Sequence, residues 1–537
     1  MPSRRRDYLY VPLFIALCSL AVGMFSGGGV KAATSLEDAT ANSSKSFTSV
    51  YDLVEKNFAD PVKPDKAIYN GAIPGMLREL DPHSNFFDPK AYRALRDDQE
   101  GHYYGVGMTV QAHANHVVVM APFTGSPAYK AGLRPGDVII MVNDKSTDGL
   151  DVSGVADLLK GPKGTQVQVV VTREGSDKPI TFNIIRDEIN RASVSDVFWL
   201  KPGIAYVKID QFNENTSKEL TDKLSALPEK DIKGLILDLR ENPGGLLNEG
   251  IEVAGHFLKK NETVVSVRGR AQPNKTYTAR SDNGGKDYPI VDIVNRYTAS
   301  AAEIVSGALQ DHDRAWIFGE TTFGKGLVQQ VYPLSDNTGL ALTTAHYYTP
   351  SGRLIQRDYS NISFLDYYYH TNLNERNTQD VKMTDSGRTV YGGGGITPDE
   401  KYTVPKLNKF QIQLLRKYSF YDFSAKFFAG RHEATLPKGW EPDEQLVNQF
   451  HDFLMTNKVQ FADADFISNH DWIKEQLKYQ LAITGFGYDE SEKIRIEQDP
   501  EVLKAIDSLP KAKALVDNAK KMMVQRFALQ DRLAAVK

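Results

Sequence analysis

Cysteine is almost absent from this 537-residue chain, whose only one is Cys18. A single thiol cannot form an intramolecular disulfide, so core packing must hold the folded part together. The 11 histidines are scattered and form no His/Cys cluster at zinc-ligand spacing, so we expect no metal centre. The formal net charge of −4 lacks the basic excess that is typical of a general nucleic-acid-binding protein.

An apolar run at residues 8–25 follows three arginines at positions 4–6 and leads to small residues ending at Ala32. This order is typical of an export signal, which would comprise residues 1–32. With about 18 residues the run is near the lower limit for crossing a bilayer, so an uncleaved anchor stays open, although the pattern favours cleavage. A lipid on Cys18 is disfavoured by the large leucine before it. We expect an exported protein, periplasmic or otherwise extracytoplasmic.

Hydrophobic spacing divides the rest of the chain into four segments. Residues 33–97 begin with a polar tether over 33–46, after which apolar residues recur at helical spacing. Residues 98–188 alternate short β-branched runs with Gly and Pro, which favours a compact, barrel-like module. Residues 189–405 alternate strand and helix patterns and are predicted to form an α/β domain, and residues 406–537 are predicted to be helical.

The expected helices and strands are short, and the sequence contains no internal repeat. Strands are predicted over 117–120, 138–142, 167–172, 180–185, 204–209, 234–239, 289–294 and 315–318, and helices over 66–80, 152–159, 216–227, 246–258 and 301–311.

Ser300 stands where an apolar strand gives way to small residues and then to a helix. At such a junction the hydroxyl lies beside unpaired backbone N–H groups and the positive end of the helix dipole. Those donors are what the oxyanion of a tetrahedral intermediate needs. The position also suits a simple helix cap, so Ser300 alone identifies no enzyme.

A serine nucleophile needs a base, and Lys325 is the better candidate. It lies between two glycines in an apolar stretch after a predicted strand. Close backbone approach and apolar neighbours would desolvate the ammonium group and favour the neutral amine, which can accept a proton from serine. His312 would lie about three turns along the helix and point elsewhere. The rest of a phosphate-loop motif is missing around Lys325.

The segment from Leu239 to Gly245 reads Leu-Arg-Glu-Asn-Pro-Gly-Gly after a predicted buried strand. Such a turn can direct backbone N–H groups into a cleft, and it can equally be a plain strand–helix connection.

Together these three segments resemble the C-terminal processing (tail-specific) serine peptidase family. In that family a lysine within Gly-Lys-Gly-x-x-Gln stands 25 residues after the nucleophile, as Lys325 does after Ser300, and Gln329 occupies the glutamine position. The Leu-Arg-x-Asn-Pro-Gly-Gly turn also matches, and the likeness covers about residues 45–405. Two flanking serines of many members are replaced here, by Thr298 and Ala302.

The resemblance implies roles for individual residues. Ser300 would be the nucleophile, Lys325 the general base and Gln329 the residue that orients the lysine. The oxyanion hole would consist of backbone amides, at Ala301 and at either Gly244 or Gly245. His83 lies in a family landmark at 80–84, but its Pro-flanked turn far upstream favours a structural role over a triad histidine.

The barrel-like module resembles a PDZ domain, through the Tyr-Gly-Val-Gly-Met segment at 104–108 and Ala-Gly-Leu-Arg-Pro-Gly-Asp at 131–137. Such domains bind a peptide as an added strand and capture its terminal carboxylate with loop amides. By this likeness the carboxylate loop would be Tyr104, Gly105, Val106 and Gly107, and the side-chain pocket would be lined by Met108 and Val110.

The resemblance therefore implies a multidomain α/β protein. A PDZ domain and helical N- and C-terminal segments would accompany a protease core with the α/β spiral of crotonase-like enzymes. The expected activity is that of a serine endopeptidase that cleaves exported proteins near free, largely apolar C-termini through an acyl-enzyme, without cofactor or nucleic acid. Inner-membrane association and a homo-oligomer stay open.

Two other functions remain as alternatives. An inactive PDZ scaffold is disfavoured by the intact set of Ser300, Lys325 and Gln329, and a crotonase-like acyl-CoA enzyme is disfavoured by the PDZ-like module.

Overall fold

The computed structural model describes residues 36–535 apart from 272, 361–365, 368–379 and 431–434. The predicted export signal, the anchor at 8–25 and Cys18 therefore lie outside the described residues. The chain forms two compact units. The first ends at Met76, and the second begins at Leu77.

The N-terminal unit is helical in its described part. Its helices are α2 (Leu36–Asn57), α3 (Pro64–Ala67), the π-helix η1 (Ile68–Ala72) and the start of α4 (Ile73–Arg78). The prediction of a tether is wrong for residues 36–46, which belong to α2. That stretch contains neither Gly nor Pro, so no residue breaks the helix once it has begun.

A six-stranded sheet in the order β10-β11-β12-β15-β16-β21 forms the centre of the second unit. Only β10 runs antiparallel to its neighbour. The strands are β10 (Val194–Lys201), β11 (Ile204–Ile209), β12 (Gly234–Asp238), β15 (Ile290–Val294), β16 (Ala315–Gly319) and β21 (Glu400–Lys401), and the connecting helices include α8 (Thr216–Ser225), α9 (Leu247–Phe257) and α10 (Ala301–Asp311). The predicted elements between 204 and 318 are confirmed to within two residues at each end.

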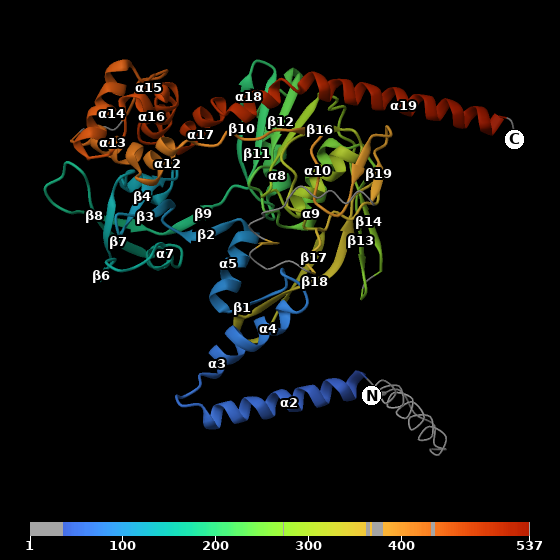
Figure 1. Cartoon of the computed structure of the whole chain (residues 1–537), viewed down its shortest axis with the longest axis horizontal. Helices are drawn as coiled ribbons and strands as arrows, with labels where there is room; N and C mark the ends of the chain where they lie inside the picture. The colour runs from blue at the N-terminus through green and yellow to red at the C-terminus, as the bar shows by residue number, and fades with distance from the viewer. Residues whose placement is uncertain (1–35, 272, 361–365, 368–379, 431–434, 536–537) are drawn as a thin grey trace, which may run out of the picture. The chain divides into compact units, whose positions relative to one another are not determined.

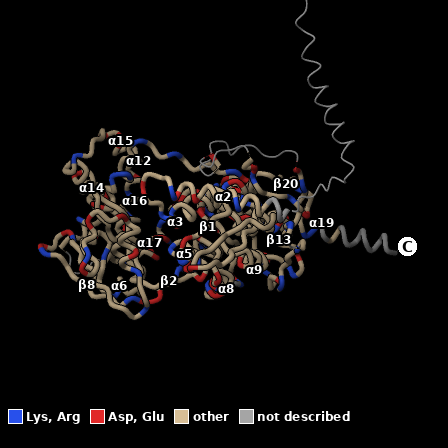
Figure 2. Tube along the Cα trace, turned by 90° about the horizontal axis from the view of Figure 1, so that it is seen from below, with Lys and Arg blue, Asp and Glu red and all other residues tan. Residues whose placement is uncertain are grey.

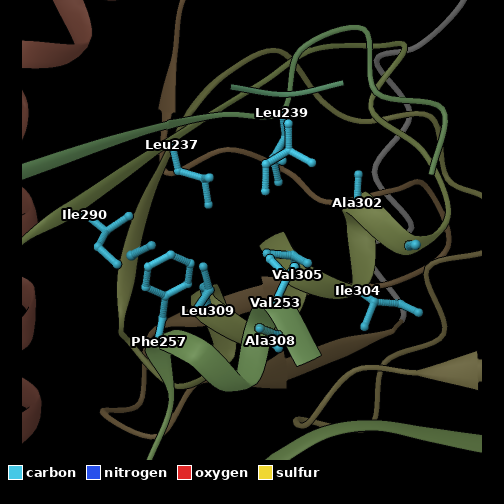
Figure 3. Packing of buried hydrophobic residues seen from close by; sticks show 14 of the residues in the cluster. Leu237, Leu239, Val253, Phe257, Ile290, Ala302, Ile304, Val305, Ala308 and Leu309 are labelled. Carbon is cyan, nitrogen blue, oxygen red and sulfur yellow. The ribbon is translucent and has the colours of Figure 1, made fainter. Parts of the chain in front are cut away.

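Both faces of this sheet are covered, which is why its strands read as nearly continuous apolar runs. On one face Leu237 and Ile290 pack with Phe257 of α9 and Leu309 of α10, and these side chains point toward one another in Figure 3. On the other face Ile236, Ile293 and Phe318 pack against α18 (Pro500–Ile506) and the beginning of α19 (Leu509–Ala535), a long helix that extends past the sheet in Figure 1. Helix α18 and the beginning of α19 are thus part of the core of the α/β domain.

A second sheet packs beside the first and brings the Lys325 loop to it. It has the order β1-β18-β13-β14, and β17 pairs with the opposite edge of β18. The strands are β1 (Asn85–Phe87), β13 (Thr263–Gly269), β14 (Lys275–Thr278), β17 (Leu327–Pro333) and β18 (Gly339–Tyr348).

The β-rich module has its own apolar core, which includes Val119, Val142 and Val169. Its main sheet has the order β3-β4-β5-β7-β8, and a separate pair is β2-β9. The elements are β2 (His102–Gly105), β3 (Met108–His113), β4 (His116–Pro122), β5 (Val138–Val142), α7 (Val152–Leu159), β7 (Gln166–Thr172), β8 (Ile180–Ile185) and β9 (Asp187–Asn190).

The segment after residue 405 begins with a helical bundle around stacked aromatic rings, among them Phe420 and Phe450 with ring centroids 4.8 Å apart. Its helices are α12 (Lys409–Arg416), α13 (Ser419–Phe428), α14 (Glu444–Thr456), α15 (Asp463–Ser468), α16 (His470–Gly485) and α17 (Tyr488–Glu497). The bundle contacts the β-rich module, because Tyr421 donates to the Val119 carbonyl over 3.0 Å and His113 Nε2 lies 2.9 Å from Asp422.

Basic and acidic residues are scattered among each other over the described chain, as Figure 2 shows. No described helix combines the length and the apolar composition that crossing a membrane requires.

Candidate active site

Ser300 lies at the carboxyl end of β15, where the chain turns into α10. Its backbone angles are φ 56° and ψ −116°, a conformation that L-residues rarely adopt and that costs about 1–3 kcal/mol. This sharp turn places the serine immediately before the N-terminus of α10, with the Ala301 amide as the first of the helix. Unpaired N–H groups and the positive end of the helix dipole meet there.

Lys325 lies on the loop between β16 and β17, and its amine is held by Gln329. The Lys325 Nζ donates to Gln329 Oε1 over 2.9 Å, and Gln329 Nε2 donates to the His83 carbonyl over 2.5 Å. Because the carbonyl accepts from the Nε2 side, the Oε1 side of the amide faces the lysine. Burial lowers the pKa of Lys325, against the opposing charges of Glu303 and Asp81.

One cleft of about 450 Å³ brings the predicted site residues together. Its walls include Ser300, Ala301, Lys325, Gln329, Gly244, Gly245 and His83, and its apolar part includes Phe212, Leu246, Ile304 and Leu327. The three sequence segments, separated by dozens of residues, thus line a single cavity.

The Asn-Pro-Gly-Gly turn abuts the serine so closely that Gly244 has no room for a side chain. A Cβ at Gly244, where φ is 94°, would lie 2.7 Å from the Ser300 Cβ and 2.8 Å from the Ala301 nitrogen. Asn242 clamps the turn: its Nδ2 donates to the Ile209 carbonyl and its Oδ1 accepts from the Gly244 amide, both over 2.8 Å.

Sequence reasoning missed Glu303, a fully buried carboxylate in the first turn of α10. Its Oε2 accepts the backbone N–H groups of Ser300 and Lys325, each over 2.9 Å. Its Oε1 accepts the Gly324 N–H over 2.7 Å and the Thr322 hydroxyl over 2.5 Å. One side chain therefore ties the serine turn to the lysine loop. A glutamate three residues after a helix-start serine is a sequence signal for a capping box, but it does not reveal the second loop.

The histidines take other places. His83 lines the cleft, but its Nε2 lies 2.9 Å from the Tyr367 hydroxyl, and burial together with the Lys325 charge lowers its pKa to about 4. His312 does not line the cleft. Its Nδ1 lies 2.7 Å from Asp385 Oδ2, and its Nε2 lies 2.7 Å from the Thr263 carbonyl oxygen. His83 contributes its carbonyl, as the bond to Gln329 shows.

Comparison with known proteins gives the family. Residues 203–361 match the model of peptidase family S41, and residues 118–173 match a PDZ domain. The carboxy-terminal-processing protease of Bartonella bacilliformis is 39% identical over 315 residues, which are 58% of this chain and 72% of that protein. This chain belongs to peptidase family S41. It is a serine peptidase of the C-terminal processing type with a PDZ domain.

Two further relatives of this S41 peptidase cover more of it. The carboxy-terminal processing protease CtpA of Bacillus subtilis is 32% identical over 378 residues, which are 68% of this chain and 80% of that protein. Among solved structures, the photosystem II D1 C-terminal processing protease is 29% identical and covers 66% of this chain and 86% of that one, with a TM-score of 0.34.

In the PDZ domain of this peptidase, the predicted carboxylate loop is shorter than the sequence suggests. Tyr104 and Gly105 belong to β2, which pairs with β9, so only Val106 and Gly107 lie between β2 and β3. Gly107 has a φ of 77°, and a Cβ there would lie 2.5 Å from the Ser126 Cβ. Met108 is buried in the domain core.

In the described part of the S41 peptidase, no group of three or more His, Cys, Asp or Glu side chains is arranged to hold a metal ion.

Proposed function

We propose that this S41 peptidase cleaves exported proteins near their C-termini by acyl-enzyme chemistry, with Ser300 as nucleophile and Lys325 as general base. The observation that carries the proposal is the burial of the Lys325 amine in the cleft that Ser300 lines, because this burial lowers its pKa. A lowered pKa supplies neutral amine, which arginine or an exposed lysine cannot.

In the proposed reaction Lys325 removes the Ser300 proton as the hydroxyl oxygen attacks the peptide carbonyl. The ammonium then protonates the leaving amine, and the C-terminal fragment departs from the acyl-enzyme. Water, deprotonated by the same amine, hydrolyses the ester and restores both groups. Gln329 accepts one hydrogen of the amine and so directs the nitrogen lone pair toward the serine.

The oxyanion formed in each step would be stabilised by two backbone amides. One is that of Ala301, at the positive end of α10. For the other we choose Gly245 over Gly244, because the Gly244 N–H already donates to Asn242 Oδ1. The Phe212 N–H donates to the Gly244 carbonyl, and the Phe212 carbonyl accepts the Leu246 N–H. Because backbone groups alternate in direction along an extended segment, the Gly245 N–H faces away from Phe212.

Substrate choice would fall to the PDZ domain, where β3 is an edge strand of its sheet and would receive a free, largely apolar C-terminus as an added strand. The turn at Val106 and Gly107, flanked by Tyr104, Gly105 and Met108, would hold the terminal carboxylate. The helix-covered core at 189–405 would be a crotonase-like α/β spiral, and the export signal at 1–32 would carry the enzyme to the compartment of its substrates.

Ser300→Ala tests the chemistry, with Ser306→Ala on the same helix as the matched control. We expect Ser300→Ala to lose peptide cleavage and fluorophosphonate labelling while its thermal unfolding stays nearly unchanged, and Ser306→Ala to keep both. Cleavage retained by purified Ser300→Ala would refute the assignment.

The PDZ role is tested separately with peptides that carry a free or an amidated C-terminus. Amidation should weaken binding to the wild type, and Gly107→Val should weaken binding of the free acid, since a side chain there meets Ser126. Equal affinity for acid and amide would contradict capture of a carboxylate.

A further inference from the structure

Tyr347 of β18 reaches the two segments that carry the nucleophile and the base. The side chain is 1% exposed, yet it lines the cleft. Its hydroxyl lies 3.0 Å from the Ser300 carbonyl oxygen and 2.6 Å from the Lys325 carbonyl oxygen. A phenol has a single hydrogen, so the two carbonyls share one donor. Tyr347 lies outside the motifs that carry the family resemblance.

The bond to the Ser300 carbonyl bears on the oxyanion hole. The Ser300 carbonyl and the Ala301 N–H belong to one rigid peptide plane, so whatever holds the oxygen also holds the direction of the N–H. Ser300 has the rare backbone conformation described above, and its carbonyl also accepts the Ile304 N–H of the helix over 3.0 Å. The hydroxyl adds a second anchor to that plane, and hydrogen bonds weaken steeply once the donor turns away.

The bond to the Lys325 carbonyl bears on the base. That carbonyl shares a peptide plane with the Gly326 N–H, which donates to Gln356 Oε1 over 2.8 Å. Glu303 accepts the N–H groups of Ser300 and Lys325, and the Tyr347 hydroxyl donates to the carbonyls of the same two residues. Ser300 and Lys325 are therefore linked twice, through their N–H groups by Glu303 and through their carbonyl groups by Tyr347.

We infer that Tyr347 is a positioning residue, which sets the direction of the Ala301 amide and the separation of Ser300 from Lys325 through its shared hydroxyl. This inference rests on the proposed roles of Ser300 and Lys325. Burial raises the pKa of Tyr347 well above its usual value, so the hydroxyl stays a donor wherever Lys325 can act as a base.

Tyr347→Phe removes this donor and keeps the ring. The matched control is Tyr348→Phe on the neighbouring residue, whose ring lies under the Arg268 guanidinium at 4.2 Å and whose side chain points to the opposite face of the strand. Incorporation of 3-fluorotyrosine at position 347 restores the donor and serves as the rescue.

The readouts are kcat, KM and the pH dependence of kcat, each corrected by active-site titration so that misfolded protein does not count. For Tyr347→Phe we expect kcat to fall about 10-fold or more, less than the loss of a direct oxyanion donor, with KM changed less than about 2-fold. We also expect the midpoint of its pH profile to rise, as the lysine gains freedom to reach solvent. Tyr348→Phe and the fluorotyrosine protein should stay within about 2-fold of the wild type.

Ser300→Ala, assayed in parallel, separates the two levels of the argument. Active Ser300→Ala would overturn the proposed function itself. Inactive Ser300→Ala with wild-type kcat and pH profile in Tyr347→Phe would overturn the role of Tyr347 alone. A fall in stability with no change in kcat would do the same, since a merely structural hydroxyl predicts that result.

Discussion

Two buried carboxylates, Glu303 in the first turn of α10 and Asp292 on the strand that packs against this helix, have very different surroundings. Glu303 accepts four hydrogen bonds, from Ser300, Thr322, Gly324 and Lys325. Asp292 of β15 lies between Ile290 and Val294 on the face toward α10 and is also fully buried. Neither of its oxygens, nor the hydroxyl of buried Ser306, has a hydrogen-bond partner among the described residues.

The comparison separates burial from partnership. Glu303 lies at the positive end of α10, which favours its negative charge. Its two oxygens accept all four hydrogen bonds, and the carboxylate thereby joins the serine turn to the lysine loop. Burial raises the pKa of Asp292 to about 7. The first group builds the active site, and the second costs stability without a visible return.

The largest effect that would sharpen this contrast is expected from Glu303→Gln. The amide NH₂ of glutamine would face N–H donors that now meet an oxygen, and buried donors left unpaired cost about 1–3 kcal/mol each. We expect kcat to fall about 100-fold or more, because Ser300 and Lys325 would lose their common anchor. Steady-state kinetics on the folded protein measures this. A Glu303→Gln enzyme as active as the wild type would mean that the four bonds do not hold the site.

Asp292→Asn addresses the other carboxylate through the pH dependence of stability. The pKa of Asp292 rises from 3.8 unfolded to about 7 folded, so the unfolded chain loses this proton first as the pH increases. The folded state should therefore lose stability between about pH 4 and pH 7 and no more above, by up to about 4 kcal/mol for a shift of about three units.

Asparagine does not titrate, so the variant should lack this loss while keeping its activity. Urea denaturation of both proteins at about pH 4.5 and pH 7.5 gives the difference, in which the other titrating groups cancel. An equal pH dependence in the two proteins would show that Asp292 is not the buried acid that we describe.

A smaller effect is expected from two single-hydroxyl deletions, Thr322→Val and Ser306→Ala. Thr322→Val removes one of the four donors to Glu303 and should cost about 1–2 kcal/mol of unfolding free energy and several-fold in kcat. Ser306→Ala removes a hydroxyl without a partner and should change unfolding free energy by less than about 1 kcal/mol and kcat not at all. If the two variants behaved alike, the contrast between the two buried carboxylates would fail.

The sequence predicts helices and strands well, but it predicts poorly which side chains form hydrogen bonds with distant segments. The helix at 301–311 and the strand at 204–209 are predicted to the residue, because apolar periodicity and small-residue turns are local signals. The roles of the cleft residues Ser300, Lys325 and Gln329 are implied by the resemblance to the family's motifs. Glu303 and Tyr347 could not be found that way, since all their partners except Ser300 for Glu303 lie 19 to 47 residues away in the sequence.

The C-terminal segment shows the same limit. Its apolar periodicity predicts helices but not the surfaces they cover, and α18 and α19 turn out to complete the core of the six-stranded sheet. Residues 36–46 show the opposite error, because small polar residues favour a linker in isolation and still continue a helix that has begun.

The central claim is that Lys325 acts as a neutral amine within the cleft. Its most direct test is the pH dependence of kcat/KM for the wild type, Lys325→Arg and Lys325→Ala. The wild-type rate should rise with pH as Lys325 deprotonates, with a midpoint below the ordinary lysine pKa of 10.5, because burial lowers it. Lys325→Arg should stay inactive throughout, since arginine keeps its proton. An active arginine variant, or the same rise with pH in Lys325→Ala, would contradict the account.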